Sequence, residues 1–559
     1  MPALGGSPAS FKMAGGGKRK GRSATGILFT IMASFVVLSF LFAVYSFSRR
    51  HYPTERLEDY SKFATDQPED FQVGDPTLGG LLLRPEEYGG PEQCVSRYEE
   101  ILIRKPSPYL PSSYLISKLR KYEDRHKRCA PKATKMSQNG SNSKEDLGDC
   151  QFVIWIANSG LGNRMITITS AFVYALLTDR ILLLDHSGTD VNGLYCEPFP
   201  GTSWLLPENY DYNWINDMTW ENKHKLGLYL QENGTANVTI PNPIPNNYIF
   251  INLMHDYDDY DKRFFCNRIQ KQVRNVPILY WRSNNYAVPG LHFDHEFHRE
   301  LDLMFPERDT MFHHMIRYLF RPSNVMWGPI LRFRQPYLRS AHRQVGLQLR
   351  ILESNVSASV VADQLLACVL EKSLLPKQMK TAPEDTLHNS RQGTTAVVVA
   401  SLDMVYYEKL RNYYLDFPAE GDDYIAVHSP SKEEYQQYGF DHDKKAWADI
   451  YLLSLSDELV TSPWSTFGYV AHGLAGKTPW MLTKTPSGEL ALETFQAQGH
   501  CNRGVSLEPC FHAPPELDCE GHGIGQDPKT ILPFIRPCED VVGGVKIMPS
   551  FAHDRTKAS

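Results

Sequence analysis

The 559-residue chain lacks any excess of basic residues, any Cys-x-x-Cys pair and any large share of glycine or proline. With 58 Lys and Arg against 64 Asp and Glu, its net charge of −6 argues against a general nucleic-acid binder, which usually carries a basic face. Its 38 glycines and 37 prolines are too few for a collagen-like or low-complexity chain. A mean hydropathy of −0.37 excludes a polytopic membrane protein. The 42% of hydrophobic residues is enough for folded cores.

Long apolar runs are also scarce, and the one that occurs is residues 26–47, which carry no formal charge. About 20 apolar residues cross a bilayer as a helix. A cleaved signal peptide and a buried core helix are the alternatives, and the run is long for both. The preceding residues contain five Lys or Arg and no acid, which favours a cytosolic N-terminus. We therefore predict a cytosolic tail at 1–25, a transmembrane signal anchor at 26–47 and a polar stem at 48–77.

All ten cysteines follow that run, and so do four Asn-x-Ser/Thr sequons. An even number of cysteines beyond an anchor is typical of an oxidising compartment. The sequons predict glycosylation at Asn139, Asn233, Asn237 and Asn355. We expect the C-terminal cysteines to be oxidised and to staple a loop-rich tail, with the pairing left open: Cys501, Cys510, Cys519 and Cys538.

Strand-like and helix-like segments alternate in two regions of the chain. Residues 151–157 read as a buried strand, followed by glycines, a helix-length segment and a strand at 180–185. The same order recurs several times after residue 343. Such alternation predicts parallel sheets covered on both faces. We therefore predict an α/β fold with two Rossmann-type domains facing a cleft, at 150–340 and 341–489, with a lumenal extension at 78–149 and a Cys-rich segment at 490–559.

Three motifs lie where a strand meets a helix. Gly160-Leu161-Gly162-Asn163-Arg164 follows the first strand and predicts a ligand loop, with a plain tight turn as the alternative. Arg350 ends a buried strand, where open α/β sheets bind ligands, and its guanidinium suits a pyrophosphate; a structural arginine is the alternative. The hydroxyls at 462–468 predict a phosphate cradle, with helix capping as the alternative.

The sequence signals for a metal site or a hydrolase are less specific. The Asp-rich run at 255–265 reads as a solvated loop rather than a metal site, and we predict no metal ligands. A glycoside hydrolase would need a pair of carboxylates, and the sequence nominates none. Anchoring, two α/β domains and pyrophosphate-type motifs together favour a nucleotide-sugar transferase.

Long segments of the chain are similar to the plant xyloglucan fucosyltransferase family, which are type II Golgi membrane enzymes. The segments include SGLGNRMITITSAFVYALLTDRILLLD, HHMIRYLFRPSNVMWG, VGLQLR and SPWSTFGYVAHGLAGKTPW. The resemblance implies an inverting, GT-B-like transferase that takes L-fucose from GDP-L-fucose and needs no cofactor or obligatory metal. It implies a cell-wall acceptor, either xyloglucan galactose or arabinogalactan-protein arabinose, and a possible homodimer.

Carried over by position, the resemblance implies a set of site residues. Arg350 is expected to grip the donor phosphates and, with Asn163 and Asn284, to form the catalytic set. The expected donor-binding residues are Gly160, Gly162, Arg164, Gln348, Arg350, Asp403, Ser465, Thr466 and Phe467.

Asn284 is a departure from the family pattern, which has Asp at this position. A neutral amide cannot take a proton from an acceptor hydroxyl. Either the base lies elsewhere, or donor cleavage runs ahead of attack, or this chain is weak or altered in specificity. The rival function is accordingly a Golgi glycan-binding homologue without activity.

Overall fold

The computed structural model describes residues 74–137, 147–208, 210, 224–233, 248–351, 356–380, 393–421, 423–432, 434–435, 437–484, 499–515 and 532–549. The predicted anchor at 26–47 and the stem to residue 73 lie outside these ranges, as do Asn139, Asn237, Asn355 and the side chain of Asn233. Within the described ranges, no helix has both the length and the apolar character needed to cross a membrane.

The first sheet has four parallel strands in the order β2-β1-β4-β3. Their bounds are β1 Phe152–Trp155, β2 Ile181–Leu184, β3 Tyr248–Leu253 and β4 Ile278–Ser283. Every residue of these four strands is buried except Tyr248 and Arg282. Strands buried on both faces are near-continuous apolar runs and do not alternate between apolar and polar residues. Helix α7, Leu161–Thr178, connects β1 to its neighbour β2.

The second sheet has six strands in the order β10-β9-β8-β5-β6-β7. Their bounds are β5 Arg343–Leu349, β6 Gly393–Ser401, β7 Asp423–His428, β8 Glu458–Thr461, β9 Trp480–Leu482 and β10 Cys501–Arg503. All pairs are parallel except β10 with β9, because β10 comes from the C-terminal segment and returns along the sheet edge. Its helices are α17 Ala358–Glu371, α18 Val405–Asp416, α19 Phe440–Leu453 and α20 Thr466–Ala475. The predicted α/β class with parallel sheets is confirmed.

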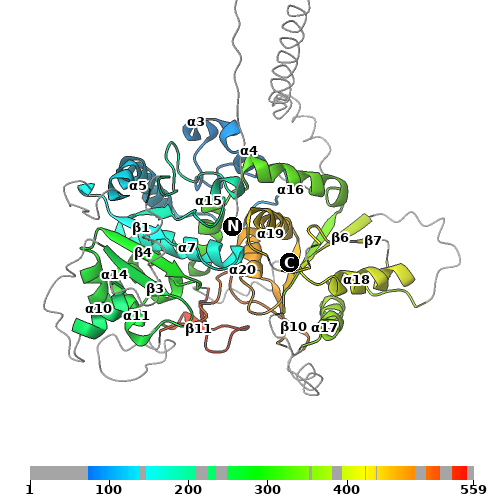
Figure 1. Cartoon of the computed structure of the whole chain (residues 1–559). Coiled ribbons are helices and arrows are strands. Elements are labelled where there is room, and N and C mark those ends of the chain that lie inside the picture. The colour runs from blue at the N-terminus through cyan, green and yellow to red at the C-terminus, as the bar shows by residue number, and fades with distance from the viewer. Residues whose placement is uncertain are drawn as a thin grey trace, which may run out of the picture. The chain divides into compact units, whose positions relative to one another are not determined.

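The other described elements surround these sheets (Figure 1). The helices are α3 Pro85–Tyr88, α4 Val95–Glu99, α5 Ser113–Cys129, α8 Val191–Leu194, α10 Leu226–Asn233, α11 Asp259–Lys262, α12 Asn267–Val273, α13 Val288–Leu291, α14 His295–Met304, α15 Met311–Leu319 and α16 Asn324–Tyr337. Short 3₁₀ turns lie at Pro91–Gln93, Glu100–Leu102, Ala130–Ser137, Arg263–Phe265 and Arg308–Thr310. A small antiparallel pair, β11 Ile535–Pro537 with β12 Val545–Ile547, ends the described chain.

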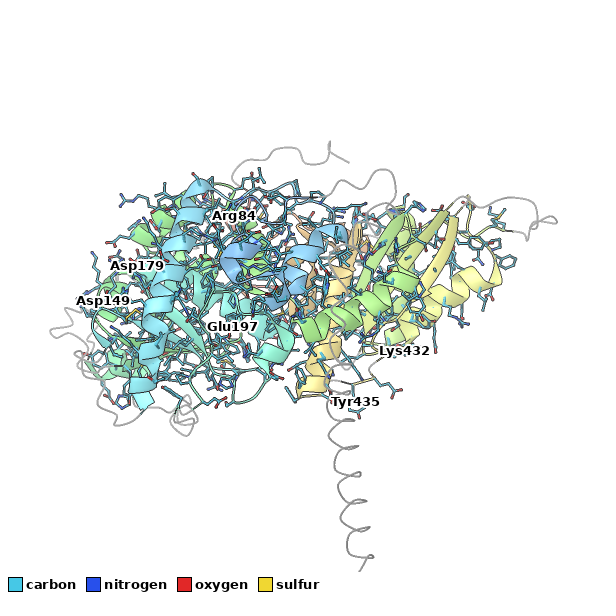
Figure 2. All side chains as sticks on the ribbon, turned by 90° about the horizontal axis from the view of Figure 1, so that it is seen from above. Arg84, Asp149, Asp179, Glu197, Lys432 and Tyr435 are labelled. Carbon is cyan, nitrogen blue, oxygen red and sulfur yellow. A yellow bond between two sulfur atoms is a disulfide. The ribbon has the colours of Figure 1, made fainter. Side chains whose placement is uncertain are left out.

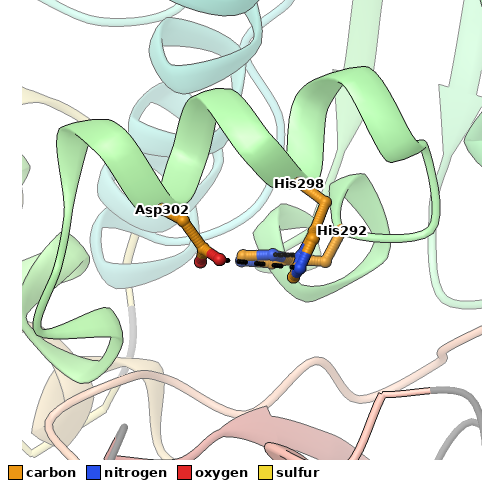
Figure 3. Close-up of side chains that lie close together, drawn as sticks. All are labelled: His292, His298 and Asp302. Carbon is orange, nitrogen blue, oxygen red and sulfur yellow. Dashed lines mark hydrogen bonds and ion pairs between the residues drawn. The ribbon is translucent and has the colours of Figure 1, made fainter.

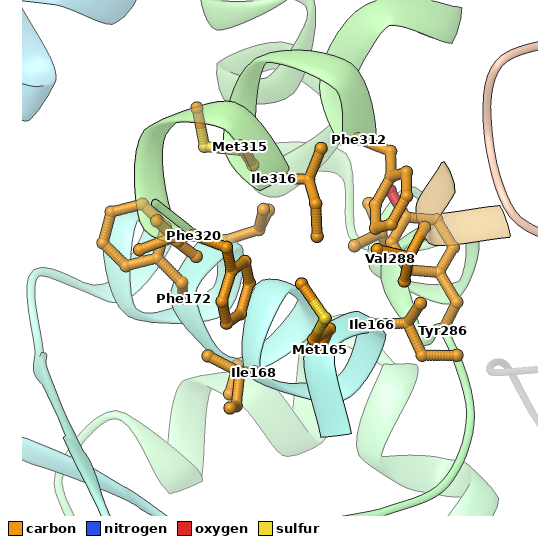
Figure 4. Close-up of a cluster of buried hydrophobic side chains, with 14 of the residues drawn as sticks. Met165, Ile166, Ile168, Phe172, Tyr286, Val288, Phe312, Met315, Ile316 and Phe320 are labelled. Carbon is orange, nitrogen blue, oxygen red and sulfur yellow. The ribbon is translucent and has the colours of Figure 1, made fainter. Parts of the chain in front are cut away.

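Helix α7 is the central element of the first half. Apolar residues occupy all its faces, so the helix is enclosed on every side rather than presenting one stripe. Figure 4 shows its Met165 and Phe172 packed with Phe312 and Ile316 of α15, all of them fully buried. This packing fixes α7 in place, and with it the N-terminal turn that the glycines introduce.

Disulfides join distant parts of the chain. They are Cys94–Cys196, Cys129–Cys150, Cys368–Cys501 and Cys510–Cys538; Cys266 is bonded as well, and Cys519 lies outside the described residues. The expectation that the tail cysteines staple only the tail is wrong for Cys501. It bonds to Cys368 on α17, because β10 completes the second sheet and lies over that helix.

We expect the double variant Cys368→Ser/Cys501→Ser to fold less stably. This bond links residues 133 apart in sequence, and a native disulfide closing a long loop stabilises a protein by about 2–5 kcal/mol. Thermal unfolding of both forms measures the difference, and mass mapping of the wild type checks the pairing. An unchanged melting temperature would contradict this role.

Candidate active site

A cleft of about 790 Å³ lies between the start of α7 and the carboxyl ends of β5 and β6. In Figure 1, α7, α19 and α20 lie together at the meeting of the two sheets. The lining residues are Gly160–Arg164, Gln348–Arg350, Ala400–Leu402, Ser431, Gln437, Tyr438, His442, Asp443, Ala446, Asp449, Thr466 and Phe467. The carboxyl ends of parallel strands are where open α/β sheets bind ligands.

The glycine motif forms the first turn of α7, and not a loop before the helix as the sequence suggested. Gly160 is the N-cap, and no side chain caps the first N–H groups. Gly162 has no room for a side chain: an added Cβ would lie 2.8 Å from Thr466 Oγ1 and 2.9 Å from the Phe467 nitrogen. The start of α7 therefore approaches the start of α20 closely. Two helix N-termini bring partial positive charge to one place.

Asn163 joins three elements across the cleft floor. Its Nδ2 donates to the backbone oxygen of Asn284 (3.1 Å), which follows β4. Its Oδ1 accepts a hydrogen bond from Thr466 Oγ1 (3.0 Å), at the start of α20. Both ends of the amide are engaged, so Asn163 holds the two halves of the site in register.

Arg164 forms an ion pair with a residue that the sequence did not single out. Its Nη2 lies 2.5 Å from Asp443 Oδ1 on α19, and both side chains are at least nine-tenths buried. Asp443 also accepts a hydrogen bond from Thr189 Oγ1 (3.3 Å). Removing one partner of such a pair leaves a buried charge uncompensated. Arg164 lines the cleft, but Asp443 already balances its charge.

Arg350 projects from the end of β5 at the boundary of two cavities. It lines the main cleft and a neighbouring cavity of about 510 Å³, which also contains Trp464 and Asp540. Its backbone N–H donates to Ser462 Oγ (3.0 Å), which ties the end of β5 to the residue after β8. Burial lowers the pKa of Arg350, and a guanidinium remains cationic at any physiological pH. Gln348, two residues earlier, is buried and lines the same cleft.

The serine, threonine and phenylalanine of the third motif have separate roles. Ser465 is the N-cap of α20 and accepts from the Gly468 N–H (3.5 Å), as the capping alternative predicted. Thr466 and Phe467 form the first turn and line the cleft. Asp403 is not among the lining residues; its Oδ1 accepts from the Val405 N–H (2.9 Å) at the start of α18. Asp403 therefore binds a backbone N–H at the start of α18, whose N-cap residue is Met404.

Asn284 is not among the residues that line the cleft, and its main-chain oxygen contacts Asn163, which does line it. Its side-chain Oδ1 accepts the backbone N–H of His255 (2.9 Å), and its Nδ2 lies 2.8 Å from His255 Nδ1. The first bond fixes the amide orientation, so Nδ2 must donate to Nδ1. His255 is consequently held with its proton on Nε2. In that tautomer neither Asn284 nor His255 is ready to accept a proton from a substrate.

The Asp-rich run is more structured than a solvated loop. Lys225 Nζ lies 2.7 Å from Asp258 Oδ2 and 3.0 Å from Asp261 Oδ2. Asp258 also caps α11 through the N–H groups of Tyr260 and Asp261. Burial raises the pKa of Asp261 to about 6. These carboxylates hold the chain after β3 and do not line the cleft.

Sequence reasoning missed the segment after β7 and the start of α19. Ser431, Gln437 and Tyr438 line the cleft from that segment, and His442, Asp443 and Asp449 line it from α19. Figure 2 shows Lys432 and Tyr435 on the same segment. A signal was available: β7 is one of the predicted parallel strands, and the segment after each such strand lies at the ligand-binding edge.

Parallel α/β sheets, two converging helix N-termini and an arginine at a strand end suit a phosphate-bearing donor of the kind that nucleotide-sugar transferases use. The xyloglucan fucosyltransferase family model matches residues 53–520, and the chain belongs to that family. It is a fucosyltransferase.

Particular relatives agree with this assignment. The galactoside 2-alpha-L-fucosyltransferase of Pisum sativum is 40% identical, with 93% of each chain covered. The Arabidopsis thaliana galactoside 2-alpha-L-fucosyltransferase is 41% identical, with 85% of this chain and 83% of the relative covered. A structure of an Arabidopsis thaliana FUT1 mutant in complex with GDP superposes with a TM-score of 0.73 at 40% identity, covering 85% of this chain and all of that one.

Proposed function

We propose that this fucosyltransferase moves L-fucose from GDP-L-fucose to a plant cell-wall glycan, with inversion at the transferred carbon. The acceptor is xyloglucan galactose or arabinogalactan-protein arabinose. The protein itself is a type II Golgi membrane enzyme whose lumenal part has a GT-B-like fold. The observation that supports this most is the convergence of Arg350 and the first turns of α7 and α20 on one cleft. The GDP complex of the Arabidopsis relative supports the choice of donor.

The roles of the site residues follow from charge. When the bond between fucose C1 and the phosphate oxygen breaks, negative charge develops on the departing GDP. Arg350 offers two hydrogen bonds in a fork that matches phosphate oxygens. The N–H groups at the start of α20 add fixed dipoles that need no reorganisation. The acceptor oxygen forms the new bond to C1 as the bond to the phosphate oxygen breaks, and its proton passes to water, since neither Asn284 nor His255 is set to accept it.

The acceptor is tested by incubating the purified chain with GDP-L-fucose and either xyloglucan or arabinogalactan protein. Transfer to one of them selects the acceptor. If the fucose is β-linked in the donor and α-linked in the product, the result also supports inversion. The alternative is an inactive glycan-binding homologue, which Asn284 favours because the family pattern has an acid there. Glycan binding with neither transfer nor hydrolysis of the donor would favour that alternative.

We expect transfer to continue in excess EDTA. We expect Arg350 and the N-terminus of α20 to supply the positive charge that a leaving-group cation would supply. In the Asp-rich run, Asp258 and Asp261 are engaged with Lys225 and with helix capping, and Asp259 pairs with Lys262. Initial rates with and without EDTA, at fixed GDP-L-fucose, provide the measurement. Loss of activity that Mn²⁺ restores would instead assign leaving-group stabilisation to a metal ion.

A further inference from the structure

A further cavity, of about 650 Å³, lies between the N-terminal extension and α15. One wall is formed by residues 74–81 and 100–110, and the other by His313, His314 and Arg317 of α15. The cavity shares no lining residue with the donor cleft, so it is separate from the proposed fucosyl-transfer site.

One carboxylate serves three arginines beside this cavity. Glu100 pairs with Arg104 and Arg321, and more distantly with Arg317, whose Nη2 lies 3.6 Å from Oε1. All four side chains are at least nine-tenths buried. Burial and the nearby Arg104 lower the pKa of Arg317 to about 9, so this guanidinium remains cationic at neutral pH. Two of the three positive charges therefore lack a negative partner among the described residues.

The other charged groups that line the cavity do not supply that partner. Lys105 adds positive charge, and its Nζ lies 2.6 Å from Asp457 Oδ1. Asp75 is exposed, and its two oxygens accept backbone N–H groups of the turn that follows it, at 2.8 and 2.7 Å. No ion pair joins Asp75 to Arg317. An unpaired charge that is buried costs far more than one in water, so Arg317 requires a partner from outside these groups.

Arg317 and His314 are lining residues with unused hydrogen-bond donors. Arg317 is 5% exposed, and none of its nitrogens donates a hydrogen bond within the described chain. His314 is equally buried, lies three residues before it on the same helix face and also makes no hydrogen bond there. Burial lowers the pKa of His314 to about 4, so the ring is neutral and offers one N–H. His313 differs, because its Nδ1 donates to the Gly473 oxygen and its Nε2 accepts from Ser107 Oγ.

A second arginine in the described chain shows what a satisfied partner looks like. Figure 3 shows Asp302 of α14 directed toward His298 and His292. Arg308 holds both oxygens of that carboxylate, with Nε at 2.7 Å from Oδ1 and Nη2 at 2.8 Å from Oδ2. Arg317 is more deeply buried than Arg308 and has no such forked contact.

We propose that Arg317 and His314 bind a tetrahedral oxyanion, of the phosphate or sulfate type, in this cavity. A guanidinium offers two parallel N–H groups that match two oxygens of such an anion, and the imidazole adds a third donor. The anion offsets the positive charge that Glu100 leaves unbalanced. A single-atom anion such as chloride matches the planar fork less well, so the geometry of the donors favours an oxyanion.

The two walls of the cavity belong to different parts of the fold. The wall at residues 100–110 reaches the second half of the chain, where Arg104 Nη1 donates to the Ser454 oxygen (2.8 Å) and Lys105 pairs with Asp457. The wall at α15 packs against α7 and α20, the two helices that begin at the donor cleft.

This position gives the anion a structural role. Bound between the two walls, it holds the N-terminal extension against α15 and so supports the helix on which α7 and α20 pack. The anion does not contact the donor cleft, because the two cavities share no lining residue. It therefore acts on fucosyl transfer only through the stability of the fold.

The test follows thermal unfolding of the full-length chain in a chloride buffer to which phosphate or sulfate is added at constant ionic strength. GDP is present throughout, to fill the donor cleft. We expect either anion to raise the melting temperature of the wild type by roughly 2–4 °C, because it binds only the folded chain. Arg317→Gln should show no rise, and Arg317→Lys a smaller one, because an ammonium lacks the fork. Arg334→Gln is the matched control and should keep the full rise, since Arg334 is 6% exposed, lies on α16 and does not line the cavity.

The quantity compared is the response to the anion, so a variant that is simply less stable does not spoil the test. Arg350→Ala should respond as the wild type does, and a response lost in that variant would place the anion in the donor cleft instead. Crystals soaked in selenate, a heavier tetrahedral analogue, should show an anomalous peak within hydrogen-bond distance of the Arg317 guanidinium. Equal responses in the wild type and Arg317→Gln, or selenate bound only elsewhere, would overturn the proposal and leave a cavity that holds water.

Discussion

Replacing Arg350 by alanine is expected to reduce fucosyl transfer by about 10³-fold or more, the range seen where an arginine stabilises charge on a transferring phosphate group. The side chain leaves the end of β5 and lines the cleft, where we propose that it binds the donor pyrophosphate with its forked guanidinium. Arg350→Lys should recover little of the rate, because a point charge cannot form two parallel hydrogen bonds. Initial rates at saturating acceptor, with the melting temperature of each variant, make the comparison.

A matched control comes from the same strand. Arg343 begins β5, at the end opposite to the cleft, and Arg343→Ala should keep the wild-type rate. A near wild-type rate in Arg350→Ala would refute the assignment. A loss of rate together with a large loss of stability would indicate that the arginine acts through the fold instead.

Replacing Asn284 by aspartate is expected to raise transfer by about 10²-fold, the lower end of what general-base catalysis contributes. The new carboxylate would keep the hydrogen bond from the His255 N–H and would accept from His255 Nδ1 in place of donating to it. His255 would then carry its proton on Nδ1 and present a basic Nε2. The change therefore creates a histidine–carboxylate pair beside the cleft where the amide now prevents one.

The double variant Asn284→Asp/His255→Gln separates two explanations. If the histidine takes the acceptor proton, the gain disappears in the double variant. If the carboxylate takes it directly, the gain survives. Donor hydrolysis, measured in parallel, shows whether the change acts on the acceptor or on GDP release. Equal transfer rates in all forms would mean that position 284 is not where the acceptor proton goes.

Much of the second sheet was predictable, because its strands are short apolar runs separated by amphipathic helices. The register of Arg350 at a strand end follows from that pattern alone. In the first sheet, β3 and β4 were not predicted, because long polar stretches precede β3 and a six-residue apolar run alone does not distinguish a buried strand from part of a buried helix. The glycine motif was predicted as a loop before the helix because glycines normally weaken a helix, whereas here it forms the first turn of α7 and Gly162 allows the close approach to α20.

The site's pairwise contacts were beyond sequence reasoning. Arg164 and Asp443 are 279 residues apart in the chain, and either could have faced solvent. Asn163 looked like a substrate ligand because of its motif, and only the position of α20 shows that its amide is occupied. Ser465 was predicted as a helix cap, a phosphate ligand or both, and its bond to Gly468 shows the cap.

The late position of Cys501 has a consequence for biosynthesis. Until β10 has emerged, β9 is an edge strand with unpaired backbone groups, and Cys368 has no partner for its disulfide. Glu508, which accepts hydrogen bonds from Tyr286 and from the Phe312 N–H, is also made late. The edge of the second sheet and the buried contacts of Glu508 in the first half are therefore completed only in roughly the last tenth of translation. Premature termination before that point would leave an unpaired edge strand and a free thiol, which favour aggregation, rather than a merely shortened enzyme.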